Sequence, residues 1–299
     1  MLYSQKRPAD KRADFRAALA SGELQRFPGA FNPLSARLIE QKGFDGVYIS
    51  GAVLSADLGL PDIGLTTLTE VATRAKQIAR MTDLPAIVDA DTGFGEAMNV
   101  ARTVQEMEDA GLAGLHIEDQ VNPKRCGHLD GKQVVDENTA LQRVRAAVDA
   151  RRDPNFLIMA RTDIRAVDGL AAAVDRAKKL VDAGADAIFP EAMASLDEFA
   201  AIRAAVDVPL LANMTEFGKS ELFTVQQLAD VGMNLVIWPV SLLRLAMGAA
   251  SRGLDELENA GRLTGLLDQM QHRADLYDLI DYEGYGRFDD SVFTFTVER

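Results

Sequence analysis

The chain has 299 residues and a formal net charge of −13, with 47% hydrophobic and 26% charged residues, which is ordinary for a water-soluble globular protein. An acidic chain without a basic stripe is not expected to bind nucleic acid, and the absence of any run of about 18 apolar residues argues against a membrane span. One cysteine excludes an intramolecular disulfide framework, and together with a polar, mixed-charge N-terminal segment it favours the reducing cytoplasm.

Eight strand–helix units follow one another along the chain, as judged from short apolar runs and from the helical spacing of apolar residues. The predicted strands cover residues 24–31, 47–49, 85–91, 114–118, 156–160, 187–189, 209–212 and 235–238. The predicted helices cover residues 33–42, 66–81, 96–110, 137–151, 169–183, 195–206 and 224–230, and an eighth begins near residue 241. Several helices end at a glycine, such as Gly43 and Gly111, which is the expected left-handed stop.

Strands this short and apolar are typical of a parallel sheet that is buried on both faces. Eight such units predict an α/β fold, a closed (β/α)₈ barrel; a doubly wound open sheet is the alternative, but no Gly-rich dinucleotide turn follows the first strand. Beyond residue 252 the pattern changes to helices over residues 254–266 and 269–280. We therefore predict one barrel domain over residues 1–299, with residues 252–299 as a C-terminal helical tail that packs outside the barrel or on a partner subunit.

Polar residues gather at the carboxyl ends of the predicted strands, where barrel enzymes place their chemistry. They are Tyr48, Ser50, Gly51, Asp89, Asp91, His116, Glu118, Arg161, Thr162, Asp163, Glu191, Asn213 and Thr215. Asp89 and Asp91 lie two residues apart, so on a strand both point the same way. With Glu118 nearby they would repel one another unless a cation lay between them, and all-oxygen ligands favour Mg²⁺ or Mn²⁺ over Zn²⁺.

Alternatives remain for some of these residues. Asp62, in the loop after the second strand, could join the acid cluster, whereas Asp89 and Asp91 could instead cap a helix or serve a surface turn. His116 fits a hydrogen-bonded packing residue at least as well as a catalyst.

The only cysteine, Cys126, lies in a polar loop with Lys124, Arg125 and His128. A thiol beside such cations is expected to have a lowered pKa and to act as an acid or nucleophile, although lone cysteines are often buried filler. A metal, the Arg161 guanidinium and this thiol together suit an α-hydroxy or α-keto carboxylate. A metal-held oxyanion stabilises an enolate-like species, which makes carbon–carbon cleavage feasible.

Six stretches resemble the isocitrate lyase/phosphoenolpyruvate mutase superfamily: residues 89–95, 116–120, 124–128, 159–163, 189–191 and 212–217. The Lys-Arg-Cys-Gly-His loop at 124–128 resembles the lyase branch in particular. The resemblance implies a (β/α)₈ barrel whose last helix is exchanged with a neighbour, a homotetramer and a Mg²⁺ ion, with Mn²⁺ possible. It also implies retro-aldol cleavage of 2-methylisocitrate to pyruvate and succinate, a step of the methylcitrate cycle in propionate catabolism.

The resemblance further assigns roles to single residues. Asp89 and Asp91 would hold the metal, with Asp62 and Glu118 in its outer shell. Cys126 is implied as the general acid that protonates the succinate carbanion. Tyr48 is ranked above Glu191 as the base, and Arg161 completes the catalytic set. The implied substrate contacts are Ser50, Gly51, Ala52, Cys126, Gly127, Arg161, Glu191, Asn213, Met214, Thr215, Arg244 and Arg273.

Two features bear on the substrate and its contacts. The family's usual Ser-Gly-Gly turn is Ser50-Gly51-Ala52 here, and alanine can supply the same backbone contacts unless its φ is positive. Phe189, Ile237 and Pro239 match positions that leave apolar room for the extra methyl group of 2-methylisocitrate. One methyl is worth only about 1–3 kcal/mol, so isocitrate is an alternative substrate.

Other activities remain open at this point. A phosphonomutase or an oxaloacetate decarboxylase would share the barrel and the metal but would not need Cys126. A non-catalytic barrel that binds a dicarboxylate or a partner is the remaining alternative.

Overall fold

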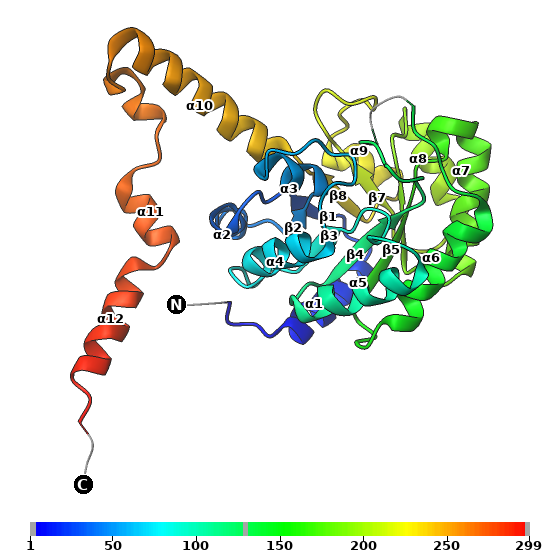
Figure 1. Cartoon of the computed structure of the whole chain (residues 1–299), viewed down its shortest axis with the longest axis horizontal. Coiled ribbons are helices and arrows are strands. Elements are labelled where there is room, and N and C mark those ends of the chain that lie inside the picture. The colour runs from blue at the N-terminus through cyan, green and yellow to red at the C-terminus, as the bar shows by residue number, and fades with distance from the viewer. Residues whose placement is uncertain (1–3, 128–130, 297–299) are drawn as a thin grey trace.

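Eight parallel strands form a ring in the computed structural model, which describes residues 4–127 and 131–296 (Figure 1). The strands are β1 (Gln25–Pro28), β2 (Val47–Ile49), β3 (Ala86–Asp89), β4 (Gly114–Glu118), β5 (Leu157–Thr162), β6 (Ala187–Pro190), β7 (Leu211–Asn213) and β8 (Leu235–Trp238). Strands β2 to β6 pair in sequence order, and β8 pairs with both β1 and β7. Single parallel bridges from Gly29 to Tyr48 and from Ile188 to Leu210 join the two sets, so the predicted (β/α)₈ barrel is confirmed.

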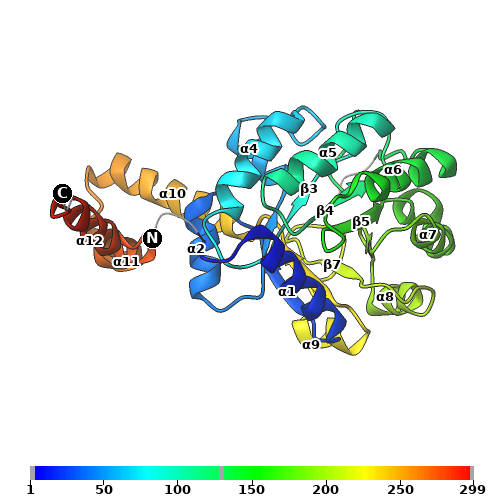
Figure 2. The same ribbon diagram turned by 90° about the horizontal axis from the view of Figure 1, so that it is seen from below.

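Helices surround this ring on its outer side (Figure 2). They are α2 (Pro33–Gln41), α4 (Leu68–Ala79), α5 (Ala97–Asp109), α6 (Glu137–Ala150), α7 (Arg165–Asp182), α8 (Leu196–Arg203), α9 (Val225–Asp230) and α10 (Ser241–Ala260). Asn32, Thr67 and Thr224 begin their helices with capping boxes, in which side chains satisfy the first free backbone N–H groups. The helix predicted from residue 169 begins earlier, at Arg165, and bends at Gly169, whose φ is 83°.

Two helices of the barrel region were not predicted from the sequence. Helix α1 (Pro8–Ala20) packs across the amino end of the barrel and buries Phe15 and Leu19 against its interior. Helix α3 (Gly51–Asp57) occupies the region expected to be a loop after β2. Because α3 starts directly at the end of a strand, it holds Ser50 to Ala52 at the carboxyl face of the barrel, and Ala52 is not among the residues with positive φ.

The strands alternate between two apolar layers. Ile87, Leu157 and Phe189 point into the barrel, while their neighbours Val88 and Ile158 pack outward against the helices. Burial of each such side chain stabilises the fold by roughly 1.5–3 kcal/mol. This alternation decides which residues at the strand ends face the interior, and therefore which can form a site.

The tail differs from the prediction. Helix α10 runs unbroken through residue 252, so the expected new helix at residue 254 is wrong; the stop is Gly261, whose φ is 64°. A 3₁₀ turn (Thr264–Gln269), α11 (Arg273–Leu279) and α12 (Tyr282–Phe293) follow. This segment extends away from the barrel (Figure 1), and it contacts α2, where Nε of Arg37 donates to the Leu279 carbonyl at 2.6 Å. In the part of the chain that is described, no helix combines the length and apolar character needed to span a membrane.

Candidate active site

A cavity of about 210 Å³ lies at the carboxyl end of the barrel strands. It is lined by Tyr48, Ser50, Ala52, Asp62, Asp89, Lys124, Cys126, Gly127, Arg161, Glu191, Asn213, Thr215, Glu216, Phe217, Gly218, Pro239, Val240 and Arg244. These residues come from distant parts of the chain, and most of them are residues that the sequence placed in a site. The thiol, the guanidinium and several carboxylates therefore share one cavity.

The acid cluster is held at the end of β3. Asp89 and Asp91 are both 5% exposed and Glu118 is 1% exposed. The amide of Asp91 donates to Oδ1 of Asp89 at 3.0 Å, and the amide of Gly51 lies 3.3 Å from Oδ2 of Asp89. A Cβ on Gly51 would lie 2.9 Å from that carboxylate oxygen, so only glycine allows this close approach.

Asp91 reaches the cluster by a different route from the one expected. Strand β3 ends at Asp89, and Asp91 has a left-handed backbone with φ of 46°. A turn, rather than the alternation of a strand, brings its carboxylate to the site. The ammonium of Lys124 contacts Asp62 and lies 2.6 Å from Oδ1 of Asp91, so this lysine, assigned from the sequence to the surroundings of the thiol, is placed among the carboxylates.

Burial and crowding perturb these carboxyl groups. Burial, followed by the charge of Asp89, raises the pKa of Asp91 to about 6. Burial raises the pKa of Glu118 well above its usual value, against the opposing effect of Arg161. Such perturbed groups gathered in a cleft are typical of functional sites.

The oxygen atoms of this cluster fit a hard divalent cation. Among the described residues both Glu118 carboxylate oxygens and Oδ1 of Asp91 are buried and accept no hydrogen bond, although Arg161 and Lys124 pair with them as ions. Mg²⁺ commonly binds through one or two carboxylates and keeps several waters. The described residues hold no group of three or more His, Cys, Asp or Glu side chains with ready metal-ligand geometry, and the Lys124 ammonium lies between two of the acids.

Arg161 lines the cavity and is surrounded by carboxylates. Its Nε lies 3.3 Å from Oε2 of Glu118, and its Nη1 lies 3.6 Å from Oε2 of Glu191. The guanidinium carbon lies 5.1 Å from the centre of the Phe189 ring, so the two groups form a cation–π contact. Burial opposes its charge, but Asp163 and the two glutamates raise the pKa of Arg161 well above its usual value, so the side chain is a fixed cation.

Tyr48 and His116 form a hydrogen-bonded pair within the barrel, with the Tyr48 hydroxyl 2.8 Å from Nε2 of His116. Burial lowers the pKa of His116 to about 4, so the imidazole is neutral at physiological pH. Burial, and then the charge of Asp89, raises the pKa of Tyr48 well above its usual value. The phenol is therefore protonated in this arrangement.

The thiol loop enters the site through Gly127. Cys126 is partly buried, and a Cβ on Gly127 would lie 2.5 Å from Nη2 of Arg161 and 2.6 Å from Cγ of Glu191. Glycine is thus required for the loop backbone to approach these two side chains. His128, which the sequence placed in the same loop, lies outside the described residues.

Three predicted substrate contacts do not line the cavity: Gly51, Met214 and Arg273. Gly51 lies beside it, with its amide 3.3 Å from Oδ2 of Asp89. Met214 is 1% exposed and packs in the apolar layer outside the strands, where its sulfur accepts from the amide of Phe223 at 3.3 Å. Arg273 is exposed on α11, in the tail. Of the apolar residues expected beside the substrate methyl, Pro239 lines the cavity, whereas Phe189 and Ile237 are buried in the barrel interior below it.

Glu216, Phe217, Gly218 and Val240 also line the cavity, although none of them was predicted as a site residue. Glu216 lines the cavity and holds Arg244, whose Nη1 lies 3.0 Å from Oε2 of Glu216 and 3.2 Å from Oγ1 of Thr215. Glu216 lies within residues 212–217, a stretch that resembles the superfamily, and it directly follows the predicted contact Thr215. Its place in the sequence could therefore have identified it as a site residue.

Comparison with known proteins agrees with this geometry. A family model described as phosphoenolpyruvate phosphomutase matches residues 15–258. A relative from Corynebacterium glutamicum named "Probable 2-methylisocitrate lyase 2" is 60% identical over 291 residues, which are 97% of this chain and 95% of the relative.

Solved structures show the same fold. Oxaloacetate acetylhydrolase in complex with 3,3-difluorooxalacetate superposes with a TM-score of 0.91 at 33% identity, covering 98% of this chain and 100% of that one. Phosphonopyruvate hydrolase in complex with oxalate and Mg²⁺ has a TM-score of 0.84 at 30% identity, covering 95% of this chain and 99% of that one. The family match, the near-complete relative and the shared barrel together show that the chain belongs to the phosphoenolpyruvate mutase/isocitrate lyase superfamily.

Proposed function

We propose that the chain is a Mg²⁺-dependent carbon–carbon lyase that cleaves 2-methylisocitrate to pyruvate and succinate. The observation that carries the proposal is that Cys126 shares one cavity with Arg161 and with two members of the acid cluster, Asp62 and Asp89. A decarboxylase or phosphonomutase does not need a thiol at this place. The 60% identity to a relative whose name specifies a 2-methylisocitrate lyase supports the same substrate.

The cations of the cavity account for binding a substrate with three carboxylates in an acidic protein. Arg161 and Arg244 supply positive charge at the wall, and Asn213 and Thr215 supply neutral polar groups beside them. Because a guanidinium can bind a carboxylate with two parallel hydrogen bonds, it also orients the substrate. The backbone at Ser50 to Ala52 borders the acid cluster and is suited to the substrate end nearest the metal.

The acids would hold Mg²⁺ through Asp89 and Asp91, with Asp62 and Glu118 around it. When bound, the ion would supply Lewis-acid stabilisation of the developing oxyanion. The structurally similar phosphonopyruvate hydrolase, solved as a complex with oxalate and Mg²⁺, supports this choice of metal.

The proton transfers are assigned to two residues of the cavity. The substrate hydroxyl loses its proton as the bond between C2 and C3 breaks, which leaves the carbonyl of pyruvate and places the electron pair on the succinate carbon. Cys126 donates a proton to that carbon. We assign the base to Tyr48, with Glu191 as the second candidate. Because the Tyr48 phenol is protonated, it takes up the substrate proton as it gives its own proton to Nε2 of the neutral His116, 2.8 Å away.

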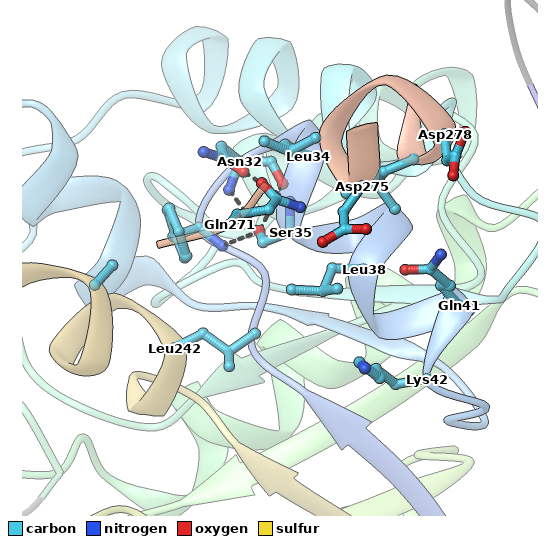
Figure 3. Close-up of a pocket in the computed structure, with 13 residues that line it drawn as sticks. Asn32, Leu34, Ser35, Leu38, Gln41, Lys42, Leu242, Gln271, Asp275 and Asp278 are labelled. Atoms are coloured by element: carbon cyan, nitrogen blue, oxygen red, sulfur yellow. Dashed lines mark hydrogen bonds between the residues drawn. The ribbon is translucent and has the colours of Figure 1, made fainter. Parts of the chain in front are cut away.

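We also propose that the chain works as a homotetramer with exchanged tails. Helix α10 buries none of its residues. Large apolar side chains of α10 and of the tail are exposed, namely Leu245, Met247, Leu254, Leu257, Leu267, Met270, Tyr277, Ile280, Tyr282, Tyr285, Phe288, Val292, Phe293 and Phe295. A cavity of about 860 Å³ separates the tail from α2 and α10, with Leu38, Leu242 and Asp275 on its walls (Figure 3). Exposed apolar surface of this extent is typical of an interface, and a second copy of the chain is the occupant we propose.

The function is tested with purified protein and Mg²⁺. We expect 2-methylisocitrate to yield equal amounts of pyruvate and succinate, faster than isocitrate does, and no turnover by the Cys126→Ser variant. Product from phosphonopyruvate or oxaloacetate, but not from 2-methylisocitrate, would overturn the proposal.

The proposed tetramer is tested by light scattering of the native chain and of a Leu254→Glu, Leu257→Glu variant. We expect this variant to dissociate into smaller species. We place the enzyme in the cytoplasm, in propionate catabolism.

A further inference from the structure

The loop that carries Cys126 is closed at its base by backbone pairing. The amide of Val121 donates to the Gln133 carbonyl at 2.9 Å, and the amide of Val135 donates to the Asp119 carbonyl at 2.8 Å. The two limbs of the loop are thus fixed to each other at the end of β4. Any side chain that crosses from one limb to the other can set the position of the residues between them.

The backbone of Arg125, the residue before Cys126, is held by the side chain of Gln120, which is 1% exposed. Its Oε1 accepts from the amide of Arg125 at 2.8 Å, and its Nε2 donates to the carbonyl of Arg125 at 2.9 Å. Both backbone groups of the residue before Cys126 are therefore satisfied by one carboxamide. This fixes one side of the thiol.

The other side of the thiol is held by Lys132. The side chain of Lys132 is 2% exposed, and its ammonium donates to the carbonyl of Gly127 and, at 2.8 Å, to Oδ1 of Asp163. Burying an ammonium without hydrogen-bond acceptors would be strongly unfavourable. The two acceptors therefore fix the position of the buried Lys132 ammonium. Gly127 is also the residue whose backbone lies against Arg161 and Glu191.

Asp163 connects this anchor to the substrate side of the cavity. It is fully buried, and its Oδ2 accepts from Nε of Arg161 at 3.0 Å. Its amide donates to Oδ1 of Asp119 at 2.9 Å, and Asp119 in turn pairs with Arg176 at 2.8 Å. One rigidly held carboxylate therefore binds both the cation that holds the thiol loop and the cation that faces the substrate.

We propose that Lys132 is a positioning residue for Cys126, which fixes the thiol relative to Arg161 by holding the Gly127 carbonyl against Asp163. The inference rests on the proposed function in that Cys126 is taken as the proton donor. A proton donor must stay close to its productive geometry, and a displacement of about 1 Å costs on the order of 10²-fold in rate. Lys132 touches neither substrate nor metal in this role, so its removal should affect turnover more than binding.

The test compares Lys132→Met with Lys132→Arg and with a matched control, Lys179→Met. Lys179 also pairs with carboxylates, Glu137 at 2.6 Å and Asp175 at 2.7 Å, but on the outer surface of the barrel. We expect Lys132→Met to lower kcat by about 10- to 100-fold with little change in KM. Lys132→Arg should recover part of the loss, and Lys179→Met should behave as the native enzyme.

A second readout needs no substrate. Cys126 is the only cysteine in the chain, so the rate of alkylation by iodoacetamide reports on this thiol alone. We expect Lys132→Met to change this rate several-fold and Lys132→Arg to bring it back toward the native value. If the native protein has no lyase activity the proposed function fails, while a changed alkylation rate still supports the positioning role.

Two outcomes would overturn the inference: native kcat in Lys132→Met, or a lowered kcat with an unchanged alkylation rate. Lys132→Met leaves Asp163 without one of its cations and can unfold the chain for that reason alone. The double variant Lys132→Met, Asp163→Asn removes the excess buried charge while keeping a carbonyl for Arg161. It should show the same altered alkylation rate as Lys132→Met, and a native rate in the double variant would count against Lys132.

Discussion

The hydroxyl of Tyr48 and Nε2 of His116 lie 2.8 Å apart, and their rings stack with an interplanar angle of 6°. On the other side of the imidazole, Nδ1 lies 3.7 Å from Oδ1 of Asp89. A neutral imidazole carries one proton, and the carboxylate favours that proton on Nδ1. Nε2 then accepts the hydrogen bond from Tyr48, so the histidine determines where the phenol proton points.

The variant Tyr48→Phe tests this pair. We expect kcat to fall by about 10²- to 10⁴-fold, because the hydroxyl is the proposed base and proton transfer contributes on this scale. The buried His116 nitrogen also loses its donor, which should lower the free energy of unfolding by about 1–3 kcal/mol. Steady-state kinetics and thermal unfolding measure the two effects. A variant with native kcat would remove Tyr48 from the mechanism.

The barrel was predictable because each strand is a short apolar run between turn signals. Strands β2, β4 and β8 have the predicted bounds. Helix α1 was missed because much of its burial comes from cations rather than from an apolar stripe. Lys11 donates to the carbonyl of Ala79 at 3.0 Å, and Arg12 donates to that of Leu112 at 2.8 Å. Hydrogen bonds to distant carbonyls leave no periodic signal in the sequence.

The candidate site was predictable in composition but not in detail. Residue types at the strand ends identified the acids, Arg161 and the thiol loop. The left-handed turn at Asp91 and the placement of Lys124 between carboxylates depend on tertiary contacts that a strand pattern does not contain. Met214 follows β7 directly, between the site residues Asn213 and Thr215, which suggested that it also faces the site. Its side chain instead packs outward in the apolar layer between strands and helices.

Gly127→Ala tests the close approach of the thiol loop. The added methyl would overlap the Arg161 guanidinium and the Glu191 side chain, so one of them or the loop must move. We expect kcat/KM to fall on the order of 10²-fold because catalytic geometry is sensitive to such shifts. Gly286→Ala is the matched control, since nothing lies within 4 Å of the methyl it would add. Kinetics within a factor of two of the native enzyme for Gly127→Ala would show that the loop does not act from this position.

The Asp91 carboxyl should make the metal-free protein less stable as the pH rises from about 4 to above 6. The folded pKa of Asp91 is about 6, above its ordinary value, so in this window the folded chain binds more protons than the unfolded chain. Stability therefore falls as this carboxyl ionises, by up to about 3 kcal/mol for a shift of about two pKa units. Thermal unfolding in the presence of a chelator measures the effect, and Asp91→Asn should flatten this dependence.

Mg²⁺ should reverse that trend, because it binds the ionised carboxylates. We expect the rise in melting temperature on adding Mg²⁺ to be larger at about pH 7.5 than at about pH 5, with protons released on binding near neutral pH. Asp91→Asn should lose most of the rise. Equal stabilisation by Mg²⁺ at both pH values would mean that the ion binds elsewhere.

Arg273 provides the last test, because within one chain it is exposed on α11 and does not line the cavity. If it contacts the substrate as its sequence context predicts, it must do so from another copy of the chain. Arg273→Ala and Cys126→Ala should each be inactive alone, but hybrid oligomers formed by co-expressing them should recover activity. In such a hybrid an intact Cys126 site of one chain receives the intact Arg273 of the other. Arg262→Ala, at another exposed arginine of the tail, should be active by itself. Full activity of Arg273→Ala would remove this residue from the substrate contacts, and inactive hybrids would place its action within its own chain.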